Sequence, residues 1–103
     1  MALMILQTTS NSKNARLLIR KVFKKGLTSC VQQDVIRSNY LWKNKRIREK
    51  EILLSFKINQ KDFKKMKKLI LKWHIYEIPE IIGVRVNKVS KSYRKWHKNT
   101  LKV

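Results

Sequence analysis

Hydrophobic and polar residues follow one another in blocks that predict alternating strands and helices. The nearly continuous apolar run at residues 2–8 is too short for a helix and suits a buried strand. After possible N-caps at residues 10–12, apolar side chains recur at helical spacing from Ala15 to Phe23. Gly26 is a natural C-terminal cap. The first unit is therefore expected to be a strand followed by a helix.

The middle of the chain predicts a long β-hairpin. Residues 28–31 and 35–42 are rich in strand-forming side chains, with a break expected at residues 33–34. The polar interval 43–46 can close the hairpin, and the apolar run 52–58 predicts the return strand.

The last third of the chain predicts a second helix, a strand and a short final helix. Asn59 can cap the second helix, in which apolar residues of the stretch 63–73 share one side and lysines lie outside. Residues 81–86 predict the last main strand, and Ser90 can begin a short helix.

The element order β-α-β-β-α-β is that of the ferredoxin-like α+β fold, an antiparallel four-stranded sheet with both helices on one face. With only two glycines and one proline the chain has no room for a flexible linker, so residues 1–103 are expected to form one domain. The opposite sheet face has no cover of its own. A small domain of this kind usually hides such a face in an oligomer or uses it for binding.

Composition narrows the class of protein. Lysine and arginine number 26 against 6 aspartates and glutamates, which gives a net charge of +20. With 43% hydrophobic residues the chain is too apolar for a disordered basic tail. A single cysteine excludes an internal disulfide framework, and no apolar run approaches the ~18 residues of a membrane span. We expect a soluble, cytoplasmic protein.

The segment 73–82 is the richest in chemistry. It holds His74, Tyr76, Glu77 and Glu80 within a few positions. In a straight strand the odd spacing of Glu77 and Glu80 places them on opposite sides, which does not suit paired-carboxylate catalysis. The chain also has no nucleophile elbow, no glycine loop for phosphate and no zinc-protease motif. An enzyme is not expected.

The same segment carries a resemblance to a known family. The pattern His-x-Tyr-Glu-x-Pro-Glu-Ile, here from His74 to Ile81, looks like the signature of the CutA divalent-cation tolerance family. Residues 27–31 are similar to that family's Leu-Ala-Ala-Cys-Val strand, and residues 51–57 to its Glu-x-x-Leu-x-x-Lys strand. Tyr40 with Trp42, and Tyr93 with Trp96, are similar to its Tyr-x-Trp and closing Tyr-x-x-Trp motifs. The five matches occur in the family's order along nearly the whole chain.

The resemblance implies a homotrimer of ferredoxin-like subunits, similar to the PII signalling proteins, with long hairpin strands that pair between subunits. It also implies a role in the response to divalent metal ions, with copper binding in some members, no required cofactor and no established enzymatic activity. This is the function we expect.

Cys30 and His74 are the candidate metal ligands, because they stand at the family's cysteine and histidine positions and suit copper or zinc. Some relatives carry further sulfur ligands where this chain has Gln7 and Leu69, so a sulfur-rich site in one subunit is not expected. The alternative is structural: Cys30 as a small buried strand residue and His74 as a hydrogen-bonded residue that ends the second helix. His97 is expected to be a solvated helix residue.

The aromatic and signature residues are expected at subunit contacts. Contacts between subunits could bring the segment around His74 near a neighbour's hairpin and form an inter-subunit cleft. The competing interpretation is that these residues only pack and form hydrogen bonds at the interface. The residues assigned to this cleft and signature are Tyr40, Trp42, Tyr76, Glu77, Pro79, Glu80 and Trp96. A catalytic inter-subunit site around His74 and Glu77 is the least favoured interpretation.

The charge of +20 supports an alternative function, the binding of nucleic acid or another polyanion. The competing interpretation is that the lysines merely solvate helix faces. Residues 51–57 lack the glycine and the repeated aromatics of an RNA-recognition strand. Only binding without sequence specificity is therefore considered.

Overall fold

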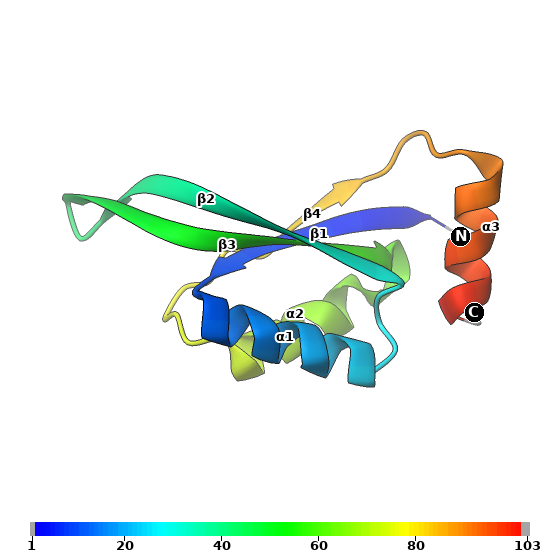
Figure 1. The fold of residues 1–103 in the computed structure, drawn as a ribbon, viewed down its shortest axis with the longest axis horizontal. Coiled ribbons are helices and arrows are strands. Elements are labelled where there is room, and N and C mark those ends of the chain that lie inside the picture. The colour runs from blue at the N-terminus through cyan, green and yellow to red at the C-terminus, as the bar shows by residue number, and fades with distance from the viewer. Residues whose placement is uncertain (1, 102–103) are drawn as a thin grey trace.

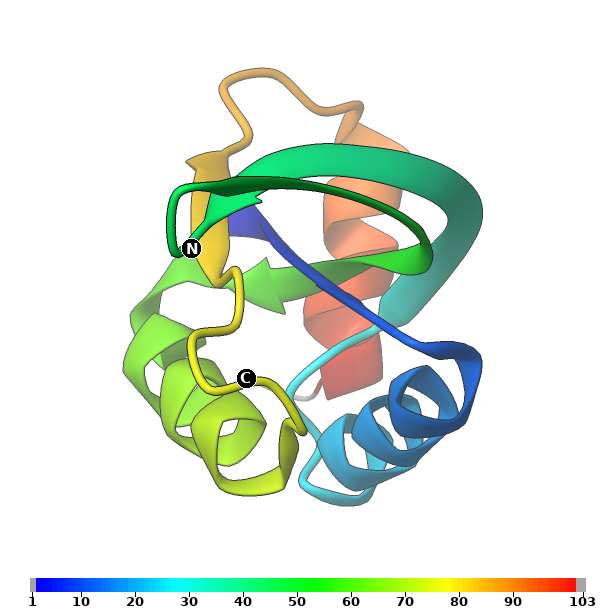
Figure 2. The same ribbon diagram turned by 90° about the vertical axis from the view of Figure 1, so that its left-hand side faces the viewer.

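The structure is a computed structural model that describes residues 2–101. Its elements are β1 (Leu3–Ser10), α1 (Ser12–Lys24), β2 (Cys30–Trp42), β3 (Lys45–Asn59), the 3₁₀ turn η1 (Gln60–Asp62), α2 (Phe63–Trp73), β4 (Ile82–Arg85) and α3 (Lys91–Leu101). The sheet order is β2-β3-β1-β4, and every neighbouring pair is antiparallel. Helices α1 and α2 lie side by side beneath one sheet face (Figures 1 and 2). The predicted ferredoxin-like fold is confirmed.

Helix α1 begins and ends where its sequence predicts. The side chain of Asn11 accepts a hydrogen bond from the backbone N–H of Asn14 at 2.8 Å, which satisfies one of the free donors of the first turn. Gly26 follows the C-cap Lys25 with a φ of +67°, a left-handed conformation that glycine adopts without a steric penalty.

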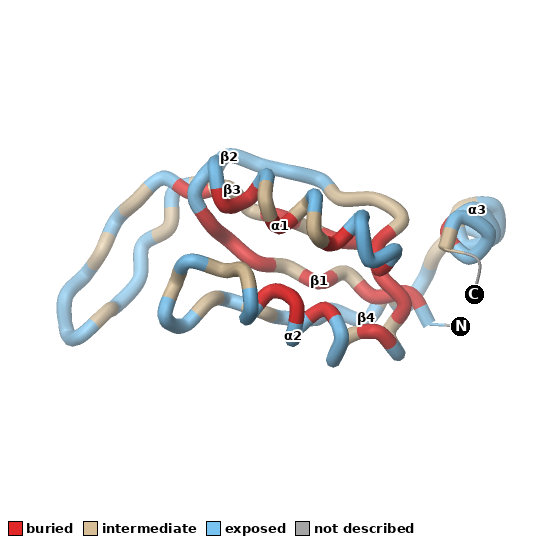
Figure 3. Tube along the Cα trace, turned by 90° about the horizontal axis from the view of Figure 1, so that it is seen from below, coloured by how far each residue is buried: buried red, intermediate tan, exposed pale blue. Residues whose placement is uncertain are grey.

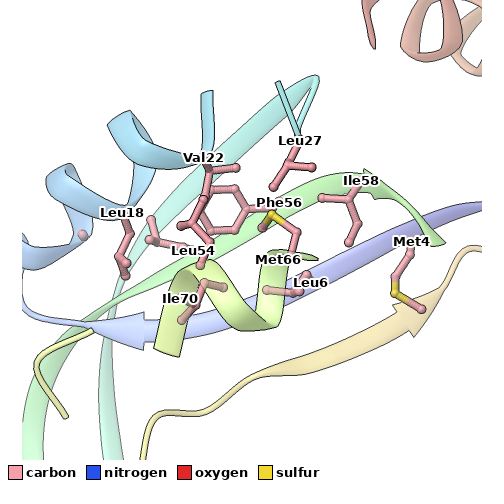
Figure 4. Packing of buried hydrophobic residues seen from close by; sticks show 12 residues of the cluster. Met4, Leu6, Leu18, Val22, Leu27, Leu54, Phe56, Ile58, Met66 and Ile70 are labelled. Atoms are coloured by element: carbon pink, nitrogen blue, oxygen red, sulfur yellow. The ribbon is translucent and has the colours of Figure 1, made fainter. Parts of the chain in front are cut away.

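The hydrophobic core lies between this sheet face and the two helices. Leu6 from β1, Leu54 and Phe56 from β3, Leu18 from α1 and Ile70 from α2 are fully buried, and Figure 4 shows their side chains pointing toward one another. Burial of each such side chain contributes about 1.5–3 kcal/mol. The core fixes the register of β3, because a shift by one residue would turn its apolar set to the other face.

The hairpin of β2 and β3 is longer and more regular than predicted. The break expected at residues 33–34 does not occur, because Gln33 pairs with Leu54 and Asp34 with Leu53 in an unbroken ladder. Lys43 and Asn44 form a two-residue turn with φ angles of 50° and 64°, as two-residue hairpin turns require. Since β1 pairs with β3 only from Ile52 onward, the rest of the hairpin projects beyond the other strands (Figure 1).

Strand β4 closes the sheet at the edge opposite β2. It is shorter than the predicted 81–86 and pairs with residues 4–7 of β1. A Cβ atom on Gly83 would lie 2.7 Å from the Met4 sulfur and 3.0 Å from the ring of Phe63. A larger residue here would displace the Met4 side chain and press on the Phe63 ring, so the close approach of β4 to these side chains favours glycine.

Helix α3 lies at the end of the molecule opposite the hairpin turn (Figure 1). As predicted, Ser90 begins it, since its hydroxyl accepts a hydrogen bond from the N–H of Tyr93 at 3.3 Å. The expectation of a solvated His97 is wrong, because this side chain is only 1% exposed. Its Nε2–H donates to Asn59 Oδ1 at 2.9 Å, and Ser29 donates to its Nδ1 at 2.5 Å. Asn59 holds α3 in this way and makes no side-chain capping bond to η1, although a cap was predicted.

The sheet face turned away from α1 and α2, hereafter the open face, has no helix over it in the described part of the chain (Figure 1). Ile82 and Val84 on β4 are about half exposed there, at 46% and 51%. This agrees with the uncovered face expected from the sequence. Within residues 2–101 no helix has the length and apolar character to cross a membrane.

Candidate functional site

A cleft opens on the open face where the hairpin, the end of β1 and the loop after α2 meet. Its volume is about 510 Å³. Tyr40 and Trp42 reach it from β2, Glu51 from β3, and Glu77 with Glu80 from the loop. The remaining lining residues are Thr9, Ser38, Asn39, Tyr76 and Ile78.

Two tyrosine–glutamate hydrogen bonds form one wall of the cleft. Tyr40 donates its hydroxyl hydrogen to Glu49 at 2.6 Å, and Tyr76 donates to Glu51 at 2.6 Å. Glu49 and Glu51 are two residues apart in β3, so both side chains point to the open face. The second bond ties the loop after α2 to the central strand pair.

His74 holds the loop in place and uses both ring nitrogens to do so. Its Nε2–H donates to the carbonyl of Thr9 at 2.8 Å, and its Nδ1 accepts the backbone N–H of Tyr76 at 3.1 Å. Burial lowers the pKa of His74, although the Thr9 carbonyl and the charge of Glu51 oppose the shift. Both bonds require the neutral ring with its proton on Nε2. No lone pair is left for a metal, so the structural interpretation of His74 fits and the ligand interpretation does not.

The cleft is electrically negative in a chain of charge +20. Glu51 is 5% exposed, and no ion pair to it occurs in the part of the chain that the structure describes. Burial first, and then Glu51, raise the pKa of Glu80 and that of the Tyr76 phenol. The hydrogen bond to Glu49 is the main cause that raises the pKa of Tyr40 to about 12. These three pKa values are also raised because ionisation of Tyr40, Tyr76 or Glu80 would add negative charge to a site that already holds carboxylates.

Four of the six carboxylates of the sequence gather at this cleft or on its tyrosines: Glu49, Glu51, Glu77 and Glu80. The arrangement attracts cations to one place on a molecule that otherwise repels them.

Cys30 lies away from the cleft. It pairs with Lys57 of β3, whereas Thr9, the partner of His74, pairs with Leu53. At about 3.3 Å per residue, these positions are some 13 Å apart along the strand. Cys30 instead lies beside Tyr93 of α3, whose pKa is raised by burial and by this thiol. One chain therefore does not bring the two predicted ligands together, and among residues 2–101 no three His, Cys, Asp or Glu side chains are grouped to hold a metal ion.

The other predicted site residues divide into two groups. Tyr40, Trp42, Tyr76, Glu77 and Glu80 line the cleft within one chain, and the predicted cleft between subunits stays a prediction. Pro79 lies within the same loop but does not line the cleft. Trp96 lies on α3 at the other end of the molecule, where its ring and that of Tyr93 are tilted by 40° with their centres 5.5 Å apart.

Sequence reasoning overlooked the two glutamates of β3 as site residues. Glu51 appeared only as the start of a family motif, and Glu49 was not considered. The alternation of Glu49 and Glu51 with the basic residues Arg48 and Lys50 is the signal that would have placed both carboxylates on one strand face.

Comparisons with known proteins agree with this architecture. Residues 3–100 match the family model described as CutA1 divalent ion tolerance protein. The chain is 31% identical to the divalent-cation tolerance protein CutA of Thermotoga maritima, over 91% of this chain and 93% of that protein. The CutA structure from Synechococcus elongatus superposes with a TM-score of 0.90 at 29% identity, covering 97% of this chain and 90% of that one.

A further similar structure is that of a CutA protein from Archaeoglobus fulgidus, with a TM-score of 0.92 at 21% identity over 96% of this chain and 98% of that one. That protein is described as a periplasmic divalent cation tolerance protein. At this identity the likeness concerns the fold alone. The cytoplasmic location expected from the sequence stays a prediction.

Proposed function

Because the chain belongs to the CutA1 divalent ion tolerance protein family, we propose that it contributes to the response to divalent metal ions by binding cations and without catalysis. The observation that carries this proposal is the gathering of carboxylates around one cleft of a strongly basic chain. Carboxylate oxygens are ligands for divalent cations of the harder kind, and negative charge raises the local concentration of any cation.

Glu51 is the central residue of this proposal. Its carboxylate is nearly buried, and among the residues that the structure describes the neutral Tyr76 hydroxyl is the one side-chain donor to it. A buried carboxylate is costly unless a positive partner compensates it. A cation drawn into the cleft, which Glu77 and Glu80 also line, would supply that compensation. Because the described residues of one chain do not group three such ligands around one point, water or a second copy of the chain would complete the coordination of that cation.

The state of His74 supports binding over catalysis. A general base needs a free nitrogen within reach of the substrate, but both nitrogens of His74 are bonded within the protein. Tyr40 and Tyr76 have raised pKa values and therefore remain protonated donors near neutral pH.

We further propose that the protein assembles as a homotrimer through its open face. The apolar residues Ile82 and Val84 are half exposed there, and the hairpin projects beyond the rest of the sheet, where it can reach another copy. Assembly would cover a sheet face that this chain leaves uncovered.

Calorimetric titration with Cu²⁺, Zn²⁺ and Mn²⁺, each alone, tests cation binding. We expect at least one metal to bind in a saturable manner and Glu51→Gln to weaken it by at least tenfold, because the substitution removes one charge at nearly constant size. Asp34→Asn is the matched control, since Asp34 is an exposed carboxylate of β2 outside the cleft and its loss should change affinity less than twofold.

The variant Cys30→Ser tests whether the metal binds at the carboxylates of the cleft or at the thiol that was predicted as a ligand. If the carboxylates hold the metal, this variant binds as the wild type does. A loss of copper affinity in Cys30→Ser with none in Glu51→Gln would instead assign binding to the thiol and contradict the role of the cleft.

A further inference from the structure

The two sides of the sheet differ sharply in charge. Helices α1 and α2 together carry ten lysines and arginines and no carboxylate. Nine of these ten basic side chains are exposed, with only Lys21 partly covered. Figure 3 views the molecule from this side and shows exposed positions along the outer turns of both helices.

The basic character continues onto the hairpin. Ile52, Leu54 and Phe56 face the helices, so by alternation Lys50, Arg48 and Arg46 belong to the same face of β3. Arg37 of β2 lies directly opposite Lys50 in the ladder and shares that face. These four hairpin residues (Arg37, Arg46, Arg48 and Lys50) are all exposed.

Most of the carboxylates lie on the other face of the sheet. Glu49 and Glu51 alternate to the open face, and Glu77 and Glu80 line the cleft there. On the helix side the one ion pair between described residues joins Lys65 to Asp62 at 4.0 Å. The directly opposed Lys50 and Arg37 have like charges, an arrangement that destabilises a strand pair. The helix side therefore repels itself unless an external anion neutralises it.

We propose that this helix-side surface, formed by the basic residues of α1, α2 and the hairpin residues Arg37, Arg46, Arg48 and Lys50, binds the sugar–phosphate backbone of nucleic acid. Neutralisation of phosphates by lysine and arginine releases condensed counterions, which drives such binding without base contacts. The surface is separate from the acidic cleft. One molecule can therefore offer lysine and arginine side chains to one ligand and carboxylates to another.

The exposed surface of the two helices favours nucleic acid over an anionic membrane. The apolar faces of α1 and α2 are turned into the core, and only Phe23 and Leu71 among their large apolar side chains are about half exposed. An interfacial helix would need an apolar face free to enter the lipid. The scarcity of exposed aromatic side chains on these helices also predicts little stacking on bases, hence binding with weak sequence preference.

Fluorescence anisotropy with labelled 20-base-pair DNA and RNA duplexes, at 50 to 300 mM NaCl, tests the proposal. The test variant carries Arg20→Gln, Lys24→Gln, Lys64→Gln and Lys68→Gln, four exposed positions on the two helices. The control carries Lys88→Gln, Lys91→Gln, Lys95→Gln and Lys98→Gln, four exposed positions in and before α3. Both variants lose the same charge, and glutamine forms helices well. Circular dichroism verifies that each variant is folded.

We expect the wild type to bind both duplexes, with a steep decline of affinity as salt increases. The helix variant should lose at least tenfold in affinity at 100 mM NaCl, and the slope of log K against log salt should fall by about 0.9 for each lost phosphate contact. The control should lose less than threefold.

Two outcomes would overturn the proposal. The first is an absence of duplex binding by the wild type at 50 mM NaCl, and binding to phosphatidylglycerol vesicles in that case would assign the surface to an anionic membrane. The second is equal losses in the two variants, which would make net charge and not this surface responsible. A preference for DNA or for RNA identifies the source of the backbone and supports the proposal in either case.

Discussion

The two faces of the sheet differ in the side chains that they carry, although the same strands supply both. One face is apolar and buried, and the other is more polar. On the helix-covered face, Leu6, Leu54 and Phe56 are fully buried among apolar neighbours. On the open face, the same strands present polar groups. The carbonyl of Thr9 accepts a hydrogen bond from His74, and the carboxylate of Glu51 accepts one from Tyr76. Stability is thus concentrated on one face, and polar groups able to bind a ligand are concentrated on the other.

Strand β3 shows how little sequence separates the two roles. Residues 52, 54, 56 and 58 are apolar and face the core, whereas Glu49 and Glu51 point the other way. Because the core determines the register, it also determines where the carboxylates lie. A stable helix-covered face is therefore what places the cleft.

The sharpest test of this division is Phe56→Ala. The ring is fully buried in the centre of the core, so its truncation leaves a cavity and should reduce the free energy of unfolding by about 3–5 kcal/mol. Urea denaturation followed by circular dichroism measures the change. A loss below about 1 kcal/mol would mean that the helix-covered face does not carry the stability.

Val84→Asp is the matched change on the open face. Val84 is 51% exposed, so we expect the folding of the single chain to change by less than about 1 kcal/mol. Light scattering should instead show the loss of assembly, because the substitution places a charge in the proposed contact between copies. If the variant still forms a trimer, the open face is not part of the interface between copies.

His97→Ala tests a third region, the attachment of α3. The substitution leaves Ser29 and Asn59 without their partner in a buried site and should cost about 2–3 kcal/mol in the free energy of unfolding. Lys95→Ala, on an exposed position of the same helix, should change it by less than about 0.5 kcal/mol. Thermal unfolding of the two variants against the wild type measures both values, and equal effects would show that the polar contacts of His97 do not hold the helix.

Much of the fold was predictable because local pattern and final burial agree. The apolar spacing of α1 and the caps at Asn11 and Gly26 are local signals, and the structure confirms them. The break predicted at Gln33 and Asp34 was wrong for a physical reason. These polar residues lie on an edge strand, where side chains remain exposed while the backbone continues to pair with β3.

The site was less predictable, because it depends on contacts between distant parts of the chain. His97 lies in a lysine-rich helix and gives no local sign of burial, yet its partners are 68 and 38 residues away. The chemistry of the segment from His74 to Glu80 was evident from its residues. That it meets Tyr40 and Trp42 of the same chain follows only from the path of the hairpin, which residue spacing does not encode.

The smallest predicted effect is a pH dependence of stability that both histidines share. Burial lowers the pKa of His74 and of His97 below the ordinary value of 6.5. As the pH falls below about 6.5, the unfolded chain therefore binds protons that the folded chain does not, and the free energy of unfolding decreases. Urea denaturation between pH 7.5 and pH 5 should show this loss of stability.

His97→Gln and His74→Gln resolve the contributions of the two regions. Each variant should be less stable than the wild type at pH 7.5 but should depend less on pH, because one titrating group is gone. Burial raises the pKa of Glu80, and this acts with the opposite sign, because the folded chain binds that proton more readily than the unfolded chain does. Both histidine variants retain Glu80, so the comparison between them is not affected by it. If only His97→Gln reduces the pH dependence, the titration belongs to the attachment of α3, and the loop that forms the cleft tolerates a protonated His74. If both reduce it, acid weakens the cleft and the α3 contact together.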